Sequence, residues 1–344
     1  MVIGYNRAAK ANYNVALLLV ILIMFSLKST EAQIGVSYGS DGNNLPSPQN
    51  VVNIYKSNGI GRMRLYYPDP AKLQAAHCSG IKIFLDVPND QVQNFAQNPQ
   101  QAVQWVQQNV APYASSINYL AVGNEVPQQV KQFVGPAMTN VRNALNSFNS
   151  LADQIKVTTT IGMSELKNTY PPSAGEFVDL PFMDPIVNFL KQNGSPLTLN
   201  LYPYFTYVQN KAQVPQDYAL FTAPGPVTTD QNNGLKYQNV YDALVDSAHA
   251  ALAKRGAGNV QIVTSETGWP NSGGDSAEPG LAGTYYRGVT HHAKYGTPLK
   301  PGPTEVYLFA MFDENQKPGN AVEQHFGIFN NDGTPKYNGI NFNQ

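Results

Sequence analysis

The segment Leu120-Ala121-Val122-Gly123-Asn124-Glu125 is an apolar run that ends in an amide and a carboxylate. A near-continuous apolar run of this length is typical of a strand covered on both faces, as the strands of a parallel sheet are. A second run, Ile262-Val263-Thr264-Ser265, leads in the same way to Glu266. The two runs therefore predict two buried strands, each with a carboxylate at its carboxyl end.

Similar runs recur along the chain and are separated by segments with helical periodicity. The β-rich runs are residues 34–38, 62–66, 82–87, 119–123, 156–160, 197–202, 261–265 and 306–312. The clearest helical patterns are residues 49–56, 101–110, 130–148 and 240–253. This alternation predicts an α/β fold, and eight such units predict a closed (β/α)8 TIM barrel. The alternative is a doubly wound open sheet, but the Gly-x-Gly-x-x-Gly turn that such sheets often carry is missing from the sequence.

The carboxyl ends of the predicted strands carry polar and aromatic side chains. These residues are Tyr38, Tyr66, Asp86, Asn124, Glu125, Tyr202, Glu266, Asp313 and Glu314. Active sites of TIM barrels lie at this end of the strands, and one acid with one nucleophilic carboxylate is the minimum needed to cleave a glycosidic bond. The sequence thus predicts a sugar-cleaving site on this rim. The strand starts carry few such groups, and Glu305 is an exception that the sequence does not explain.

The connection between the sixth strand and its helix is unusually long. It covers residues 203–238 and contains several tyrosines and phenylalanines. A loop of this length inside a compact domain is usually functional. We expect a small subdomain, inserted after strand six, that forms one wall of a substrate groove.

The first 32 residues have the features of a secretory signal peptide. Basic residues precede an apolar run at residues 15–27, and small residues lie where a signal peptidase would cut, before Gln33. The run is shorter than the ~20 residues that a membrane span needs. Residues 33–344 are then the catalytic domain, with 19 basic and 22 acidic side chains and a net charge of −3. This balance does not favour nucleic acid or a membrane as partner, whereas a neutral, tyrosine-rich surface suits an uncharged polysaccharide.

Cys78 is the single cysteine, and it lies in a helical pattern, so we expect a buried, inert thiol. Because cysteines and histidines with metal-ligand spacing are absent from the sequence, we expect neither a metal nor a cofactor. We also expect a monomer.

An ordered set of motifs resembles the plant endo-1,3-β-glucanases, family 17 of the glycoside hydrolases. The motifs are Val122-Gly123-Asn124-Glu125, Asn200-Leu201-Tyr202-Pro203-Tyr204-Phe205, Ser265-Glu266-Thr267-Gly268-Trp269-Pro270, Phe312-Asp313-Glu314-Asn315-Gln316-Lys317 and Glu323-Gln324-His325-Phe326-Gly327-Ile328-Phe329. The resemblance covers nearly all of residues 33–344. It implies a (β/α)8 barrel that cleaves 1,3-β-glucan internally with retention of configuration, with Glu125 as acid/base and Glu266 as nucleophile. The sequence departs from the family pattern at Thr264, where an apolar residue is usual, at Leu281, where an asparagine is common before Ala282, and at Asp313, where an asparagine is frequent.

Retention requires the two carboxyl groups to lie about 5–5.5 Å apart. An ionised Glu266 would also raise the pKa of Glu125 and keep it protonated for its role as acid.

Further residues of these motifs are candidates for substrate binding. Asn124 is expected to hydrogen-bond the 2-hydroxyl of the sugar at the cleavage point. Tyr66, Tyr202 and Phe205 are expected to stack on or bond to glucose rings, the alternative being core aromatics.

Trp269 is expected to be a sugar platform, or otherwise a loop anchor. Glu314 is expected to orient Glu266 and to act together with Lys317, or otherwise to form a plain ion pair on the rim.

We therefore expect a secreted endo-1,3-β-glucanase of the cell wall that acts on callose, laminarin or fungal wall glucan. Export to the wall is favoured because the C-terminal extension of the vacuolar class is not found in the sequence. Two alternatives remain open: a 1,3-1,4-β-glucanase of the same fold, and a non-catalytic glucan- or ice-binding wall protein that uses the same groove.

Overall fold

The fold is a closed barrel of parallel strands. The computed structural model describes residues 33–149 and 151–343, and the signal peptide predicted for residues 1–32 lies outside them. Within the described residues, eight parallel strands close in the order β1-β12-β11-β8-β5-β4-β3-β2. The predicted TIM barrel is therefore confirmed, and the open-sheet alternative is wrong.

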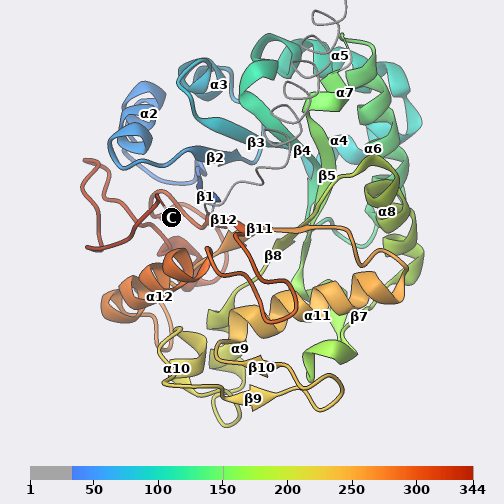
Figure 1. Ribbon diagram of the computed structural model, residues 1–344. Helices are drawn as coiled ribbons and strands as arrows, with labels where there is room; N and C mark the ends of the chain where they lie inside the picture. The colour runs from blue at the N-terminus through green and yellow to red at the C-terminus, as the bar shows by residue number, and fades with distance from the viewer. Residues whose placement is uncertain (1–32, 150, 344) are drawn as a thin grey trace, which may run out of the picture.

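The barrel strands alternate with helices that lie outside them (Figure 1). The strands of the barrel are β1 (Gln33–Ser37), β2 (Arg62–Leu65), β3 (Lys82–Val87), β4 (Ile117–Asn124), β5 (Lys156–Gly162), β8 (Leu197–Asn200), β11 (Ile262–Thr267) and β12 (Glu305–Leu308). The larger outer helices are α2 (Pro48–Ser57), α3 (Pro70–Ala76), α4 (Asn89–Gln97), α5 (Pro99–Asn109), α6 (Lys131–Asn146), α8 (Leu180–Asn193), α11 (Val240–Lys254) and α12 (Pro279–His292). Each predicted strand thus has its counterpart, with ends shifted by a few residues.

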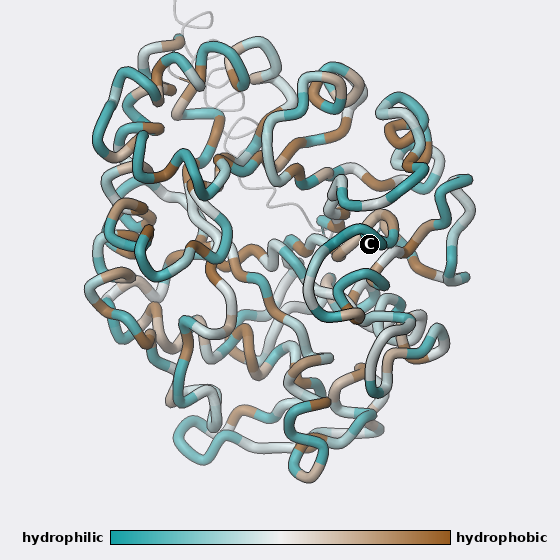
Figure 2. The backbone as a smooth tube through the Cα atoms, turned by 180° about the vertical axis from the view of Figure 1, so that it is seen from behind, coloured by the Kyte–Doolittle hydropathy of each residue, from teal (hydrophilic) through white to brown (hydrophobic). Residues whose placement is uncertain are grey.

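The hydrophobic core has two layers because neighbouring strand residues face opposite sides of the sheet. Residues such as Ile83 and Leu85 of β3 belong to the large cluster between strands and helices. Phe84 between them joins a small separate cluster with Tyr307 and other residues from β4 and β11, inside the barrel. In Figure 2 the loops at the periphery are mostly hydrophilic, and hydrophobic stretches recur along the segments that lie further inside.

Glu305, at the start of β12, closes the amino end of the barrel interior. Its carboxylate lies 3.2 Å from Nη1 of Arg62. It also accepts hydrogen bonds from the hydroxyls of Tyr119, at 2.9 Å, and Tyr307, at 2.8 Å. The charge that the sequence left unexplained is therefore compensated by neighbouring strands.

The long insertion after β8 contains small elements of its own. They are α9 (Pro203–Gln209), α10 (Gln216–Ala219) and the antiparallel pair β9 (Thr228–Thr229) and β10 (Lys236–Tyr237). A second, shorter hairpin after β5 was not predicted; it pairs β6 (Leu166–Lys167) with β7 (Glu176–Phe177). In the part of the chain that the structure describes, no helix combines the length and apolar character needed to cross a membrane.

The prediction of a buried thiol at Cys78 was wrong. Helix α3 ends at Ala76, and Cys78 lies in the following turn with a φ of 59° and is exposed. The helical pattern in the sequence extends past the point at which the backbone leaves the helix.

Candidate active site

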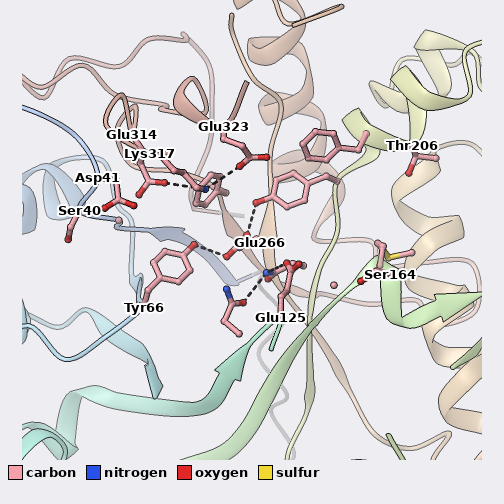
Figure 3. A pocket seen from close by; sticks show the side chains of 18 of the residues that line it. Ser40, Asp41, Tyr66, Glu125, Ser164, Thr206, Glu266, Glu314, Lys317 and Glu323 are labelled. Atoms are coloured by element: carbon pink, nitrogen blue, oxygen red, sulfur yellow. Dashed lines mark hydrogen bonds and ion pairs between the residues drawn. The ribbon is translucent and has the colours of Figure 1, made fainter. Parts of the chain in front are cut away.

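A cleft of about 920 Å³ crosses the carboxyl end of the barrel. Figure 3 shows Ser40 and Asp41 at one end of the cleft, Ser164 and Thr206 at the other, and Glu125 and Glu266 between them. Most of the residues predicted for substrate binding also line it. They are Tyr66, Asn124, Tyr202, Phe205, Glu314 and Lys317. The structure thus brings both predicted carboxylates and six of the seven other site residues together.

Glu125 follows the last residue of β4 and has a left-handed backbone with a φ of 44°. Its Oε1 accepts a hydrogen bond of 2.6 Å from Nδ2 of Asn200. Its other oxygen packs against Gly162, where an added Cβ would lie only 2.7 Å from Oε2. Burial raises the pKa of Glu125 above its ordinary value, and the negative charge of Glu266 raises this pKa further. Glu125 is therefore poised to hold a proton, as a general acid must.

Glu266 lies near the end of β11 and is 7% exposed. One oxygen accepts hydrogen bonds from Nη1 of Arg64, at 3.0 Å, and from the hydroxyl of Tyr66, at 2.8 Å. The other oxygen accepts a bond of 2.6 Å from the hydroxyl of Tyr202. Burial raises the pKa of both tyrosines well above 10, so both hydroxyls remain donors. These donors fix the carboxylate in one orientation and stabilise its charge.

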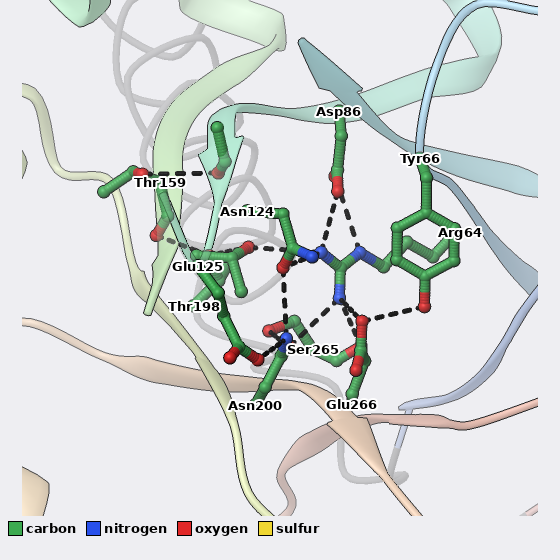
Figure 4. A network of polar contacts seen from close by, with 12 residues as sticks. Arg64, Tyr66, Asp86, Asn124, Glu125, Thr159, Thr198, Asn200, Ser265 and Glu266 are labelled. Carbon is green, nitrogen blue, oxygen red and sulfur yellow. Dashed lines mark hydrogen bonds and ion pairs between the residues drawn. The ribbon is translucent and has the colours of Figure 1, made fainter. Parts of the chain in front are cut away.

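Arg64 links the two carboxylates and was not predicted as a site residue (Figure 4). Its guanidinium is fully buried and pairs with Asp86 at 2.8 Å. It also donates to Oδ1 of Asn200 at 3.1 Å, and Asn200 in turn donates to Glu125. Burial lowers the pKa of Arg64, but the carboxylates of Asp86 and Glu266 raise it more, so this side chain stays charged. A charged residue within an apolar β-rich run was the signal in the sequence, because buried charges need partners.

Asn124 lies between the two halves of this network. Its Oδ1 accepts from Nη2 of Arg64 at 2.9 Å and from Nδ2 of Asn200 at 3.0 Å. Its backbone N–H donates to Oδ1 of Asn89 at 2.8 Å. Both of these side-chain contacts use Oδ1 and Asn124 lines the cleft, so its amide NH₂ is left to donate to a sugar hydroxyl.

Glu314 contacts Lys317 rather than Glu266. Nζ of Lys317 lies 3.7 Å from Glu314 and 3.1 Å from Glu323, and it sits 4.7 Å from the centre of the Phe309 ring. Burial raises the pKa of Glu314 to about 7. The donors described above orient Glu266, whereas Glu314, Lys317 and Glu323 form a charged wall beside it.

The sugar-platform role expected for Trp269 is wrong. The indole is completely buried, and its Nε1 donates to the carbonyl of Ser276 at 2.8 Å. It packs against Tyr204 and, in a stacked arrangement, against Tyr207. Trp269 therefore anchors the loop after β11 against the insertion, which was the alternative for this residue.

Two of the residues that depart from the family pattern also have structural partners. The hydroxyl of Thr264 is 2.7 Å from that of Tyr241 on α11. Asp313 accepts from the backbone N–H of Gly327 at 2.8 Å and pairs with Lys336 at 2.6 Å. Within residues 33–149 and 151–343, no three His, Cys, Asp or Glu side chains form a group that could hold a metal ion.

Comparison with known proteins matches nearly the whole described chain. The model of the glycosyl hydrolases family 17 matches residues 34–342. A glucan endo-1,3-beta-glucosidase of Vitis vinifera is 49% identical over 332 residues, which cover 94% of this chain and 96% of the relative. The basic vacuolar isoform GLB of that enzyme from Nicotiana tabacum is 44% identical over 338 residues, covering 95% and 90% of the two chains. A solved structure from work on two plant beta-glucan endohydrolases with distinct substrate specificities has a TM-score of 0.85 at 42% identity and covers 89% of this chain and 99% of its own.

Proposed function

The chain belongs to the glycosyl hydrolases family 17, and from this premise we propose that it is a glucan endo-1,3-β-glucosidase that acts by double displacement with retention. The observation that carries the proposal is the contrast between two carboxyl groups in one cleft. Glu125 has a raised pKa, whereas Glu266 receives hydrogen bonds from three donors. This difference suits one group to donate a proton and the other to attack as an anion.

In the first step, the carboxylate of Glu266 attacks the anomeric carbon while the glycosidic bond breaks. Glu125 gives its proton to the departing oxygen. The donors on Glu266 hold the attacking oxygen in place, which lowers the entropic part of the barrier. Asn124 is placed to bind the 2-hydroxyl, a contact that strengthens in the transition state of glycoside hydrolysis.

In the second step, a water molecule attacks the same carbon and releases Glu266. Once Glu266 is esterified, its negative charge no longer raises the pKa of Glu125. Glu125 is then more acidic and can accept a proton from the water as a general base. The same residue thus acts as acid and then as base, because the charge of its neighbour changes between the steps.

The shape of the cleft favours internal cleavage of a chain. The carboxylates lie between the Ser40–Asp41 end and the Thr206 end of the cleft (Figure 3), so a glucan can lie across the barrel with units on both sides of the scissile bond. Helix α9 of the insertion supplies Phe205, Thr206 and Gln209 to the second end. We propose 1,3-β-glucan as the polysaccharide, a monomer as the active form and the cell wall as the location. The predicted signal peptide supports export. The tobacco relative is named a vacuolar isoform, and the location of a fluorescent fusion protein would show whether this chain goes to the cell wall or to the vacuole.

The test is the release of reducing sugar from laminarin and from barley mixed-linkage glucan by wild type and by Glu266→Ala. We expect laminarin to be the better substrate and the variant to be inactive. Glu176→Gln is the matched control, because this carboxylate pairs with Lys254 at the surface, outside the cleft. Preference for the mixed glucan would indicate the 1,3-1,4 specificity. A folded wild type that hydrolyses neither polymer would overturn the enzyme assignment and favour a binding protein.

A further inference from the structure

The Ser40–Asp41 end of the cleft carries an exposed aromatic ring that the catalytic steps do not use. Tyr67 follows Tyr66 directly, lines the cleft and is 42% exposed. Sugar rings pack their apolar faces on aromatic side chains, so an exposed ring that lines the cleft can bind a glucosyl unit. At the opposite end, the aromatic side chain in the cleft wall is the half-buried Phe205. The two ends of the cleft are therefore built differently.

The Tyr67 ring is held in a fixed position. Its hydroxyl donates to Oγ of Ser40 at 2.7 Å, which joins the β2–α3 loop to the β1–α2 loop. Oγ of Ser40 also accepts a bond of 2.5 Å from Nζ of Lys72. A ring that is fixed before binding loses little conformational entropy when a ligand packs on it.

Lys72 holds Ser40 in place through this hydrogen bond, and its side chain is buried, at 6% exposed. It lies in the first turn of α3, where the cap residue Asp69 accepts from its backbone N–H at 3.1 Å. Its ammonium sits 3.8 Å from the centre of the Tyr38 ring and 3.3 Å from the carbonyl of Gly39. Burial lowers the pKa of Lys72 to about 8, so the side chain remains a cationic donor at neutral pH. The buried Lys72 and the exposed Tyr67 thus both bind the β1–α2 loop, through Gly39 and Ser40.

Asp41, next to Ser40, is exposed and also lines the cleft. Its backbone carbonyl accepts from the N–H of Gln316 at 2.7 Å, which ties the loop to the segment after β12. Asp41 therefore has a fixed backbone and adjoins Ser40, which binds the Tyr67 hydroxyl, and both Asp41 and Tyr67 line the cleft. Carboxylates accept hydrogen bonds from sugar hydroxyls, so a ring face and an acceptor lie together here.

We propose that Tyr67 and Asp41 form an outer subsite for a glucosyl unit of the glucan, with Lys72 as the positioning residue that fixes it. The proposal rests on the proposed function, because it assigns this end of the cleft to the same polysaccharide. The apolar face of a pyranose packs on the Tyr67 ring, and Asp41 accepts from its hydroxyls. The subsite lies away from the reacting carbon, so it contributes only when the substrate is long enough to reach it.

The experiment compares kcat/KM on 1,3-β-glucan oligosaccharides from trimer to heptamer. Tyr67→Ala is expected to lower kcat/KM on the heptamer about five- to tenfold, the size of a lost aromatic contact, and to leave the shortest cleaved oligomer unchanged. Tyr67→Phe keeps the ring and is expected to stay close to wild type. Tyr170→Ala is the matched control, because Tyr170 is 74% exposed and the described residues that line the cleft do not include it.

Lys72→Met tests the positioning role separately from binding. We expect the same chain-length-selective loss, and the double variant with Tyr67→Ala should be no worse than either single variant, because both remove one subsite. A loss that is equal at all lengths would mark a general structural effect and overturn this role. Thermal unfolding of each variant identifies any that fail to fold.

Calorimetric binding of the heptamer to Glu266→Gln gives a readout that does not require hydrolysis. Weaker binding on adding Tyr67→Ala to Glu266→Gln would support the subsite even if the wild type cleaved nothing and the enzyme assignment failed. A wild type that cleaves laminarin, with Tyr67→Ala unchanged at every length and in binding, would overturn the subsite and leave the proposed function intact.

Discussion

Arg62 and Arg64 are two residues apart on β2 and both point into the barrel, yet they belong to clusters with different tasks. Arg62 lies at the amino end and pairs with Glu305, which two tyrosines also contact. Arg64 lies at the carboxyl end and pairs with Asp86 and Glu266. Each cluster combines an arginine with carboxylates and tyrosine hydroxyls. Only the second contains a carboxylate that lines the cleft.

Phe84 of β3 separates the two clusters. The Arg64 guanidinium lies 4.9 Å from the centre of its ring, and the ring packs against Tyr119 at 5.5 Å and Tyr307 at 5.4 Å on the other side. The same residue types therefore close the barrel at one end and build a reactive site at the other. The difference is that Glu266 lines the cleft and Glu305 does not. Variants of the Glu266 cluster should therefore change the catalytic rate, and variants of the Glu305 cluster should change stability alone.

The largest expected effect contrasts Glu266→Gln with Glu305→Gln. Loss of the proposed nucleophile should lower kcat on laminarin at least about 10³-fold, while Arg64 keeps Asp86 as a partner and the fold is retained. Loss of the Glu305 charge should leave kcat near wild type and lower the free energy of unfolding by about 1–3 kcal/mol, because Arg62 loses its charged partner and one of the two tyrosine hydroxyls faces an amide NH₂ that cannot accept. Initial rates and urea unfolding measure both. If Glu266→Gln and Glu305→Gln lowered kcat equally, the assignment of a catalytic role to one cluster and a structural role to the other would be wrong.

The second prediction concerns Arg64→Met. It leaves Asp86, which is 1% exposed, as an uncompensated buried charge, so we expect a loss of about 3–5 kcal/mol in the free energy of unfolding. Adding Asp86→Leu should restore much of the stability but not the activity, since Glu266 still lacks one of its orienting donors. Arg62→Met is the matched variant and should cost less, because the Arg62 side chain is 17% exposed. A double variant that regained wild-type kcat would show that Arg64 serves stability alone.

The two clusters also show what the sequence could predict. The eight strands and both carboxylates were predictable because buried parallel strands are apolar runs and the rim residues follow them directly. Arg64, Asp86 and Asn200 were harder, because their partners come from strands that are distant in the sequence and meet only when the barrel closes. Trp269 was misassigned for the same reason, since the aromatic residues that bury it belong to the insertion and to α12.

Two glycines, one beside Glu125 and one beside Tyr307, give a smaller contrast between an effect on rate and an effect on stability. A Cβ at Gly162 would meet the terminal Oε2 of Glu125 at 2.7 Å, which can move, whereas one at Gly35 would meet the buried Tyr307 ring at 2.4 Å, which cannot. Gly162→Ala should therefore lower kcat about tenfold by displacing the carboxylate, with little change in stability. Gly35→Ala should lower the free energy of unfolding by about 1–3 kcal/mol through overpacking. Initial rates and melting temperatures, measured on the same preparations, check both expectations. The prediction is wrong if both variants lower only kcat or both lower only the melting temperature.

The smallest expected effect is a shift in pH dependence at Asn200→Ala. Asn200 donates to the carboxylate of Glu125, and a hydrogen bond to the charged form lowers a pKa. Its removal should raise the pKa of Glu125 further, so the protonated acid persists to higher pH. The alkaline limb of kcat/KM, which reports the acid in the free enzyme, should therefore move to higher pH. Tyr119→Phe, which removes a donor from Glu305 at the other end of the barrel, should leave the profile in place. A shift toward lower pH in Asn200→Ala would mean that a group other than Glu125 sets this limb, because removal of a donor to the Glu125 carboxylate raises the pKa of Glu125.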